Sequence, residues 1–154
     1  MEIIYSKEDL ENFVKSCDEI NFIPTMGNLH NGHLNLVRES RKFKGSSLVS
    51  IYVNPLQFAA NEDLAIYPRS LEADIKKLEL LSCDAVFCPE NDFSNDAPRL
   101  IANPMLAQKL CGLSRPHFFD GVISILSHFF RLIHPKNVFF GLKDYQQFLI
   151  VKDF

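Results

Sequence analysis

The sequence predicts a doubly wound α/β domain, in which helices cover both faces of a parallel β-sheet. Short apolar runs rich in β-branched residues alternate along the chain with longer segments whose apolar residues recur at helical spacing. Strands that alternate with helices in this way pair in parallel, because each helix carries the chain back to the start of the next strand. The length of 154 residues suits one domain, so we expect a single unit over residues 1–154.

The expected strands are apolar runs bounded by turn residues, and they lie at residues 2–5, 20–24, 46–53, 84–89 and 137–141. The expected helices lie at residues 6–17, 31–43, 70–82, 121–135 and 143–154, with one short helix near 104–111. Ser6 and Ser70 are expected to cap the helices that follow them, because a hydroxyl can accept a free backbone N–H. The helix over 70–82 is clearly amphipathic, with Leu71, Ile75, Leu78 and Leu81 expected on its inner side.

Composition argues against several classes of partner. The net charge is −3 with no cluster of lysine or arginine, which gives no electrostatic case for nucleic-acid binding. The longest apolar segment, residues 121–133, is interrupted by Ser, His and Arg, so no membrane span is expected. The N-terminus lacks the basic region of a signal peptide, and the cysteines form no Cys-x-x-Cys pair. We therefore expect a cytoplasmic protein with reduced thiols.

Three expected strand-to-helix turns are unusually polar. They read PTMGNLHNGH at residues 24–33, VNPLQF at 53–58 and FGLKDYQQ at 140–147. In doubly wound sheets ligands bind beyond the carboxyl ends of the strands, near the point where strand order reverses. These turns are therefore where we expect the binding site.

The first polar turn has features suited to phosphate. A helix that begins near residues 31–32 leaves unpaired N–H groups that favour anions, while Gly27 and Gly32 permit a sharp turn and close approach. His30 and His33 could donate to phosphate oxygens, where donors already in place stabilise the charge that develops when pyrophosphate leaves. Two other interpretations stay open: a zinc site, for which no third ligand is near, and a merely polar loop.

The other polar turns supply further candidates. Lys143 opens a helix and can reach phosphate, whereas Asp144 could simply complement the helix dipole. Gln147 lies one turn beyond Lys143, and Gln57 follows a strand end. Tyr67 and Arg69 precede the helix over 70–82, where a structural role for the arginine is as reasonable as ligand contact. His128 is expected to be a satisfied core or interface histidine, and His134 to complement a helix end.

Taken together, these stretches resemble the pantothenate synthetase (pantoate–β-alanine ligase) family. The matching segments follow the family's order over nearly the whole chain: PTMGNLHNGH, SIYVNPLQF, NEDLAIYPRSLEAD, RPHFFDGV and FGLKDYQQ. The H-x-G-H pattern alone indicates only the broad nucleotidyltransferase superfamily, whereas VNP-x-QF together with FG-x-KD-x-QQ is specific. The resemblance implies a Rossmann-like fold of the nucleotidyltransferase type.

The resemblance also implies an activity: ATP and Mg²⁺ are used to convert pantoate to pantoyl adenylate, whose acyl group is then transferred to β-alanine. It implies catalytic roles for His33, His30 and Lys143, and an ATP site formed by Met26, Gly27, Asn28, Leu29, His30, Asn31, Gly32, His33, Gly141, Leu142, Lys143 and Asp144. Substrate contacts are implied for Gln57, Gln147, Asn54 and Arg115, and Asp74 is a candidate for the surroundings of the metal. The family is usually a homodimer, so a homodimer is expected.

The sequence departs from the family pattern in three places. The family's RPGHF reads RPHFF, which puts His117 at the glycine and Phe118 at the histidine, and FGEKD has Leu142 in place of glutamate. Family members continue with a second ATP signature, S-S-R-N, and a C-terminal lid domain, so we expect this chain to be a truncated or short form without the lid. Two alternatives remain: a small adenylyltransferase such as phosphopantetheine adenylyltransferase, or an idle nucleotide-binding or dimerisation fragment.

Overall fold

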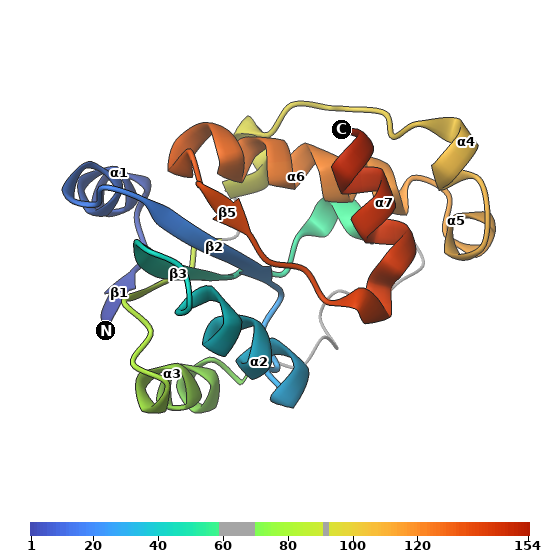
Figure 1. Ribbon diagram of the computed structural model, residues 1–154. Coiled ribbons are helices and arrows are strands. Elements are labelled where there is room, and N and C mark those ends of the chain that lie inside the picture. Colours follow the sequence, from blue (N-terminus) through green and yellow to red (C-terminus); the bar gives the residue numbers. More distant parts are fainter. Residues whose placement is uncertain (59–69, 91–92) are drawn as a thin grey trace.

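A computed structural model describes residues 1–58, 70–90 and 93–154, and within them the strands form one parallel sheet (Figure 1). The strands are β1 (Glu2–Ile4), β2 (Ile20–Thr25), β3 (Ser46–Ile51), β4 (Ala85–Phe87) and β5 (Asn137–Val138). Their order across the sheet is β1-β4-β3-β2-β5, and every pairing is parallel. The expected doubly wound α/β fold is confirmed.

Helices cover both faces of this sheet. The longer ones are α1 (Lys7–Ser16), α2 (Asn31–Ser40), α3 (Leu71–Leu80), α6 (Phe118–Ile133) and α7 (Tyr145–Asp153). The shorter ones are α4 (Pro104–Ala107) and α5 (Cys111–Ser114), with 3-10 turns η1 (Pro55–Gln57), η3 (Phe93–Asp96) and η4 (Leu142–Asp144). Figure 1 shows α1 and α6 on one face of the sheet and α2 and α3 on the other. In the described part of the chain, no helix combines the length and apolar character needed to cross a membrane.

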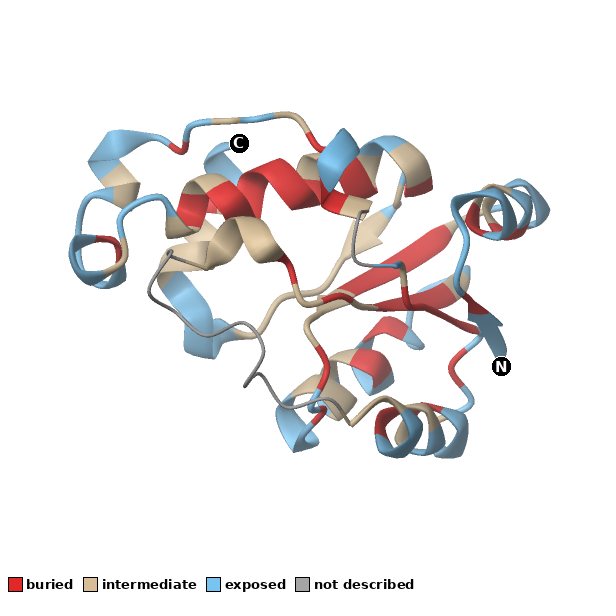
Figure 2. Cartoon of the chain, turned by 180° about the vertical axis from the view of Figure 1, so that it is seen from behind, coloured by how far each residue is buried: buried red, intermediate tan, exposed pale blue. Residues whose placement is uncertain are grey.

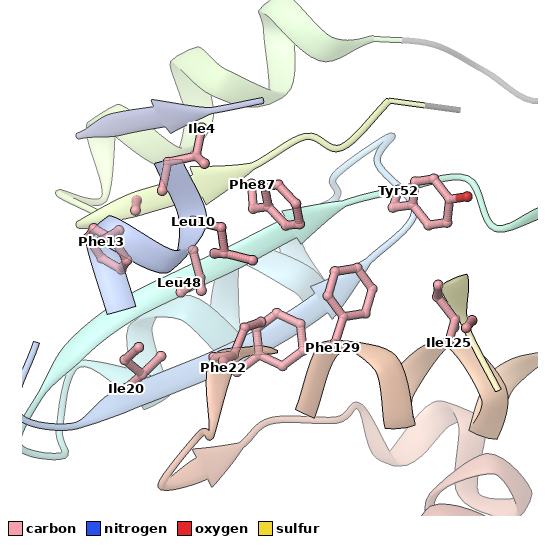
Figure 3. Close-up of a cluster of buried hydrophobic side chains, with 13 residues drawn as sticks. Ile4, Leu10, Phe13, Ile20, Phe22, Leu48, Tyr52, Phe87, Ile125 and Phe129 are labelled. Atoms are coloured by element: carbon pink, nitrogen blue, oxygen red, sulfur yellow. The ribbon is translucent and has the colours of Figure 1, made fainter. Parts of the chain in front are cut away.

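The core follows from the two-residue period of the strands. Phe22 and Leu48 point toward α1 and α6, whereas the next residues, Ile23 and Val49, point toward α2 and α3. Figure 3 shows the first of these clusters, and Figure 2 shows buried residues concentrated along the strands and α6. Both faces of the sheet are therefore buried, as is usual where every strand is parallel.

Helix α6 is buried on more than one side. Its sheet-facing side packs against Phe22 through Phe129, and its outer side packs with Ile150 of α7. It begins at Phe118, earlier than expected, because Phe118 and Phe119 extend its apolar surface. His128 is buried in this helix as expected, but its Nε2 has no hydrogen-bond partner, so it is not a satisfied histidine.

Other local differences have physical causes. The single helix expected near 104–111 is broken into α4 and α5, because Leu110 takes a left-handed φ of 48° between them. Ser6 caps α1 as expected, accepting the N–H of Asp9 at 3.0 Å. Ser70 stands at the N-terminus of α3 but does not cap it, since its hydroxyl donates to the Asp74 carboxylate instead.

The strand order fixes where a ligand can bind. From β2 the chain moves through β3 to β4 on one side, whereas β5 lies on the opposite side of β2. The connections that leave β2 and β5 therefore diverge at the carboxyl edge and open a crevice there. The H-x-G-H turn follows β2 and the FGLKDYQQ turn follows β5, so both border this crevice.

Candidate active site

A cavity of about 970 Å³ lies at this edge of the sheet. Its walls come from the turns after β2, β3 and β5, from the segment 105–115 and from the inner side of α6. This volume is typical of small-molecule sites, which combine apolar walls with a few polar groups.

The two histidines of the H-x-G-H turn close the first turn of α2. Nδ1 of His30 accepts the N–H of Gly32 at 3.1 Å, and Nδ1 of His33 accepts the N–H of His30 at 3.4 Å. Their rings lie 4.1 Å apart, centroid to centroid, and are inclined by 33°. A ring nitrogen that accepts a hydrogen bond carries no proton, so each neutral ring carries its proton on Nε2. Both rings line the cavity, where Nε2–H groups can donate to a ligand.

The surroundings of His33 favour this neutral form. Burial lowers the pKa of His33 below its ordinary 6.5, because the charged ring is less well solvated there. Electrostatic interactions with His30 and Lys143 also lower this pKa, while those with Asp74 and Asp144 raise it. The net shift is downward, so His33 is a neutral hydrogen-bond donor at neutral pH.

The lack of a side chain at Gly32 makes room for the neighbouring His30 ring. A Cβ at this position would lie 2.8 Å from Cε1 of the His30 ring, so a larger residue would push that ring aside. Gly27 has a φ of +84°, a conformation in which side chains are strained. The close approach expected at Gly32 is thus made by His30, and the sharp turn expected at Gly27 is present.

Asp74 is buried beneath the H-x-G-H turn and holds it in place. Its Oδ1 accepts the N–H of Leu29 at 2.9 Å, and its Oδ2 accepts the Ser70 hydroxyl at 2.9 Å. Lys77 lies 3.2 Å from Oδ1 and also donates to the Leu29 carbonyl at 2.7 Å. Both oxygens are therefore engaged by the protein, and neither is presented to the cavity as a metal ligand. Among the residues described, no group of three His, Cys, Asp or Glu side chains could hold a metal ion.

Asn54 fixes the orientation of Gln57. The buried Asn54 side chain accepts the N–H of Leu56 at 3.2 Å and donates to Oε1 of Gln57 at 2.9 Å and to the Gly121 carbonyl at 3.1 Å. Because Oε1 of Gln57 is engaged, its amide N–H groups are left to donate into the cavity that it lines. Asn54 thus acts as a positioning residue for Gln57.

The turn after β5 brings charge and a second amide to the cavity. Lys143 and Asp144 line it and form an exposed ion pair of 2.9 Å, which leaves the ammonium group able to change partner. Gln147 lines the same wall. The neighbouring Gln146 has another role: its Nε2 donates to the carbonyls of Leu106 and Lys109 at 2.9 and 2.6 Å, and its Oε1 accepts the Cys111 N–H at 3.2 Å. Gln146 thereby attaches the segment 105–115 to α7.

The altered RPHFF segment does not restore a histidine to the cavity. His117 takes a φ of 69°, a region that favours glycine, and its exposed ring lies 3.2 Å from the carboxylate of Asp120. Phe118 lines the cavity in its place, with the Arg115 guanidinium 4.0 Å from its ring centroid. Arg115 also donates to the Gln57 carbonyl at 3.1 Å. The structure thus puts an aromatic ring where the family pattern has an imidazole.

The structure brings most of the residues named from the sequence together. Those that line the cavity are Met26, Gly27, Asn28, His30, His33, Asn54, Gln57, Arg115, Lys143, Asp144 and Gln147. Those that do not line it are Leu29, Asn31, Gly32, Asp74, Gly141 and Leu142. Tyr67 and Arg69 lie outside the described residues.

Sequence reasoning missed two parts of the wall. The first is the segment 105–111, including Lys109, whose position depends on contacts with α7 more than thirty residues away. The second is the inner wall formed by Val122, Ile125 and Leu126 of α6 with Ser50 of β3. Ser50, which lies between Val49 and Ile51 near the end of the strand, was the one signal that could have indicated it.

Comparison with known proteins gives a consistent result. A family model described as pantoate-beta-alanine ligase matches residues 2–154. Pantothenate synthetase of Thiobacillus denitrificans is 41% identical over 161 residues, covering 99% of this chain and 55% of that protein. Pantothenate synthetase of Acinetobacter baumannii is 46% identical over 138 residues, covering 88% of this chain and 49% of that protein. The chain thus spans about half the length of the curated relatives it matches.

Solved structures agree with this match. Pantothenate synthetase from Thermus thermophilus superposes with a TM-score of 0.93 at 36% identity, covering 99% of this chain and 56% of that one. Pantoate-beta-alanine ligase from Francisella tularensis, crystallised with beta-gamma ATP and beta-alanine, superposes with a TM-score of 0.93 at 34% identity, covering 99% and 61%. With the fold, the H-x-G-H turn and the two glutamines in one cavity, these matches show that the chain belongs to the pantoate-beta-alanine ligase family.

Proposed function

We propose that this chain contains the adenylate-forming site for the ATP-dependent ligation of pantoate to β-alanine. One observation carries the proposal: a single cavity, at the carboxyl edge where the strand order reverses, is lined by the His30–His33 pair, Lys143 and the two glutamines Gln57 and Gln147. Family membership and a relative crystallised with an ATP analogue and β-alanine support the choice of substrates.

In the first step, a carboxylate oxygen of pantoate attacks the α-phosphorus of ATP. The bond from that phosphorus to the bridging oxygen breaks, and pyrophosphate leaves with the electron pair, so that pantoyl adenylate is formed. Negative charge grows on the phosphate oxygens during this transfer. Nε2–H of His30 and His33 and the Lys143 ammonium would stabilise that charge, because they are donors held in place before the reaction.

In the second step, the amine of β-alanine attacks the acyl carbon of the adenylate. The bond from the acyl carbon to the phosphate oxygen breaks, AMP leaves, and the amine loses a proton as the amide of pantothenate forms. Gln57 and Gln147 would hold the pantoyl group through their amide groups, and Asn54 would fix the orientation of the Gln57 side chain. Arg115 would contribute by supporting the Gln57 backbone.

The remaining parts of the proposal concern the metal and the assembly. ATP would enter with Mg²⁺ on its phosphates, and Asp74 would act on that ion only as a negative charge behind the turn, because its oxygens are engaged. A cytoplasmic homodimer is proposed from the family resemblance, and the four free cysteines are consistent with a reducing compartment.

Pantoate-dependent exchange of labelled pyrophosphate into ATP tests the first step alone. We expect exchange that requires pantoate and that falls about 100- to 1000-fold in His33→Ala, the usual effect of removing one transition-state donor. His134→Asn is the matched control, because it removes an exposed histidine at the far end of α6, outside the cavity. Absence of exchange in the folded chain would contradict the proposal and would favour an idle nucleotide-binding or dimerisation module.

A further inference from the structure

The hydroxyl of Ser50 is buried without a hydrogen-bond partner at the wall of the cavity. Among the residues that the structure describes, only Ser50 Oγ and His128 Nε2 are buried side-chain polar atoms that lack a partner. His128 packs against Phe93 away from the cavity, whereas Ser50 lines it. Buried polar groups are nearly always paired, so an orphan in a ligand cavity points to the ligand as its partner.

No group in the described part of the chain forms a hydrogen bond with this hydroxyl. Ser50 lies in β3 between Pro24 of β2 and Phe87 of β4, on the face that packs against α6. The nearby hydroxyl of Thr25 donates to the Ser50 carbonyl at 2.7 Å, and that of Tyr52 accepts the N–H of Ser94 at 3.1 Å. Both neighbouring hydroxyls are thus already engaged elsewhere.

Ser50 lies at the end of the cavity nearest the sheet and α6, which we call its inner end. Apart from Ser50, this inner end is apolar. The α6 side contributes Val122, Ile125, Leu126 and Phe129 to the cavity wall, and Figure 3 shows Tyr52, Phe87, Ile125 and Phe129 grouped about the end of β3. Such walls accept branched aliphatic groups, and a single hydroxyl among them selects for one polar atom in a defined position.

The chemistry at the outer end sets the direction of the substrate. The pantoate carboxylate must reach the α-phosphorus, and therefore lies toward His30, His33 and Lys143 at the carboxyl edge. Ser50 precedes the end of β3 and so lies deeper in the sheet than Asn54 and Gln57. Pantoate bound in this direction would place its terminal hydroxymethyl group toward Ser50 and its two methyl groups against α6.

We propose that Ser50 is a specificity-determining residue that pairs with the terminal hydroxyl of pantoate at the inner end of the cavity. This proposal rests on the proposed function, because it takes pantoate as the ligand. It predicts that Ser50 selects pantoate over an acid of the same shape without that hydroxyl. Removing the Ser50 hydroxyl leaves no protein group unpaired, so the substitution is expected to be neutral or stabilising for the fold.

The test is isothermal titration of the 154-residue chain with two ligands, pantoate and 2-hydroxy-3,3-dimethylbutanoate, which lacks only the terminal hydroxyl. Ser50→Ala is expected to weaken pantoate binding about five- to tenfold and to leave binding of the deoxy acid within about twofold. Its thermal midpoint should be equal to or above that of the wild type. Ser47→Ala is the matched control, since Ser47 is on the same strand but its hydroxyl pairs with Asp84 outside the cavity.

The outcomes are distinguishable. An equal loss for both ligands, or no loss for pantoate, would overturn the Ser50 subsite while leaving the proposed function in place. Failure of the wild-type chain to bind pantoate at all would overturn the proposed function for this chain and the subsite with it.

Discussion

The backbone N–H of His30 donates to Nδ1 of His33. His30 is the N-cap residue of α2, so the imidazole of His33, in the first turn of that helix, helps to cap it. A capping box is usually made by a hydroxyl and a carboxamide or carboxylate, which do not titrate near neutral pH. Here the cap requires His33 to be unprotonated at Nδ1. Helix geometry, tautomer and the direction of the Nε2 donor are thereby coupled at one residue.

This coupling predicts a pH dependence of stability. Burial lowers the pKa of His33 in the folded state below 6.5, so as pH falls the unfolded chain binds its proton first. The stabilisation present above pH 6.5 is therefore lost as pH falls toward the lowered folded-state value. Thermal midpoints of the wild type and His33→Gln between pH 8 and 5 should show the steeper fall in the wild type. The paired comparison is needed because burial also lowers the pKa of His128; parallel curves would contradict the prediction.

The contacts of Asn54 predict that Asn54→Ala impairs both stability and pantoate binding, whereas Gln57→Ala impairs binding alone. Asn54→Ala removes the acceptor for Leu56 N–H and the donor to Gln57 and Gly121, so we expect a loss of roughly 1–3 kcal/mol in unfolding free energy. Pantoate binding should weaken as well. Gln57→Ala should weaken pantoate binding with little change in stability, because Asn54 keeps its contacts to Gly121 and Leu56. Denaturant unfolding and titration of both variants check this; a stability loss in Gln57→Ala equal to that of Asn54→Ala would contradict it.

The close contact between α6 and η1 predicts a strong effect of a single methyl group. A Cβ at Gly121 would lie 2.1 Å from the Leu56 carbonyl oxygen, and neither backbone can yield without moving the turn that carries Gln57. Gly121→Ala is therefore expected to cost about 1–3 kcal/mol and to impair pantoate binding. Gly141→Ala is the control, because nothing lies within 4 Å of its Cβ position. Equal unfolding midpoints for the two variants would show that the contact is not restrictive.

The sequence predicted local features well and long-range roles poorly. Helical periodicity correctly placed α3, with Leu78 buried and Glu72 exposed, because such patterns depend only on neighbouring residues. The polar turns were likewise found at the cavity. Asp74 could not be interpreted from its neighbours, since its function depends on Leu29, 45 positions earlier in the chain. The break at Leu110 was missed for a similar reason: contacts from Gln146 hold both sides of it.

Gln146 gives a prediction about the mobility of the cavity wall. Its side chain satisfies the carbonyls of Leu106 and Lys109 and the N–H of Cys111, all of which belong to the short helices α4 and α5 or to the link between them. Helices of this length have little stability of their own, so the segment depends on these bonds for its position. Gln146→Ala is therefore expected to accelerate hydrogen exchange at the Cys111 amide about tenfold, as the loss of one or two net hydrogen bonds implies.

The same variant should weaken ATP binding, because Gln146 itself lines the cavity, and because Lys109 and Cys111, which also line it, would no longer be held there. Gln108→Ala is the matched control, since Gln108 is an exposed glutamine of the same segment and does not line the cavity. Hydrogen exchange followed by mass spectrometry, with exchange in β2 and β3 as an internal reference, separates loosening of this segment from global unfolding. Unchanged exchange at residues 104–114 in Gln146→Ala would show that the segment is held by its apolar contacts with α7 rather than by the glutamine.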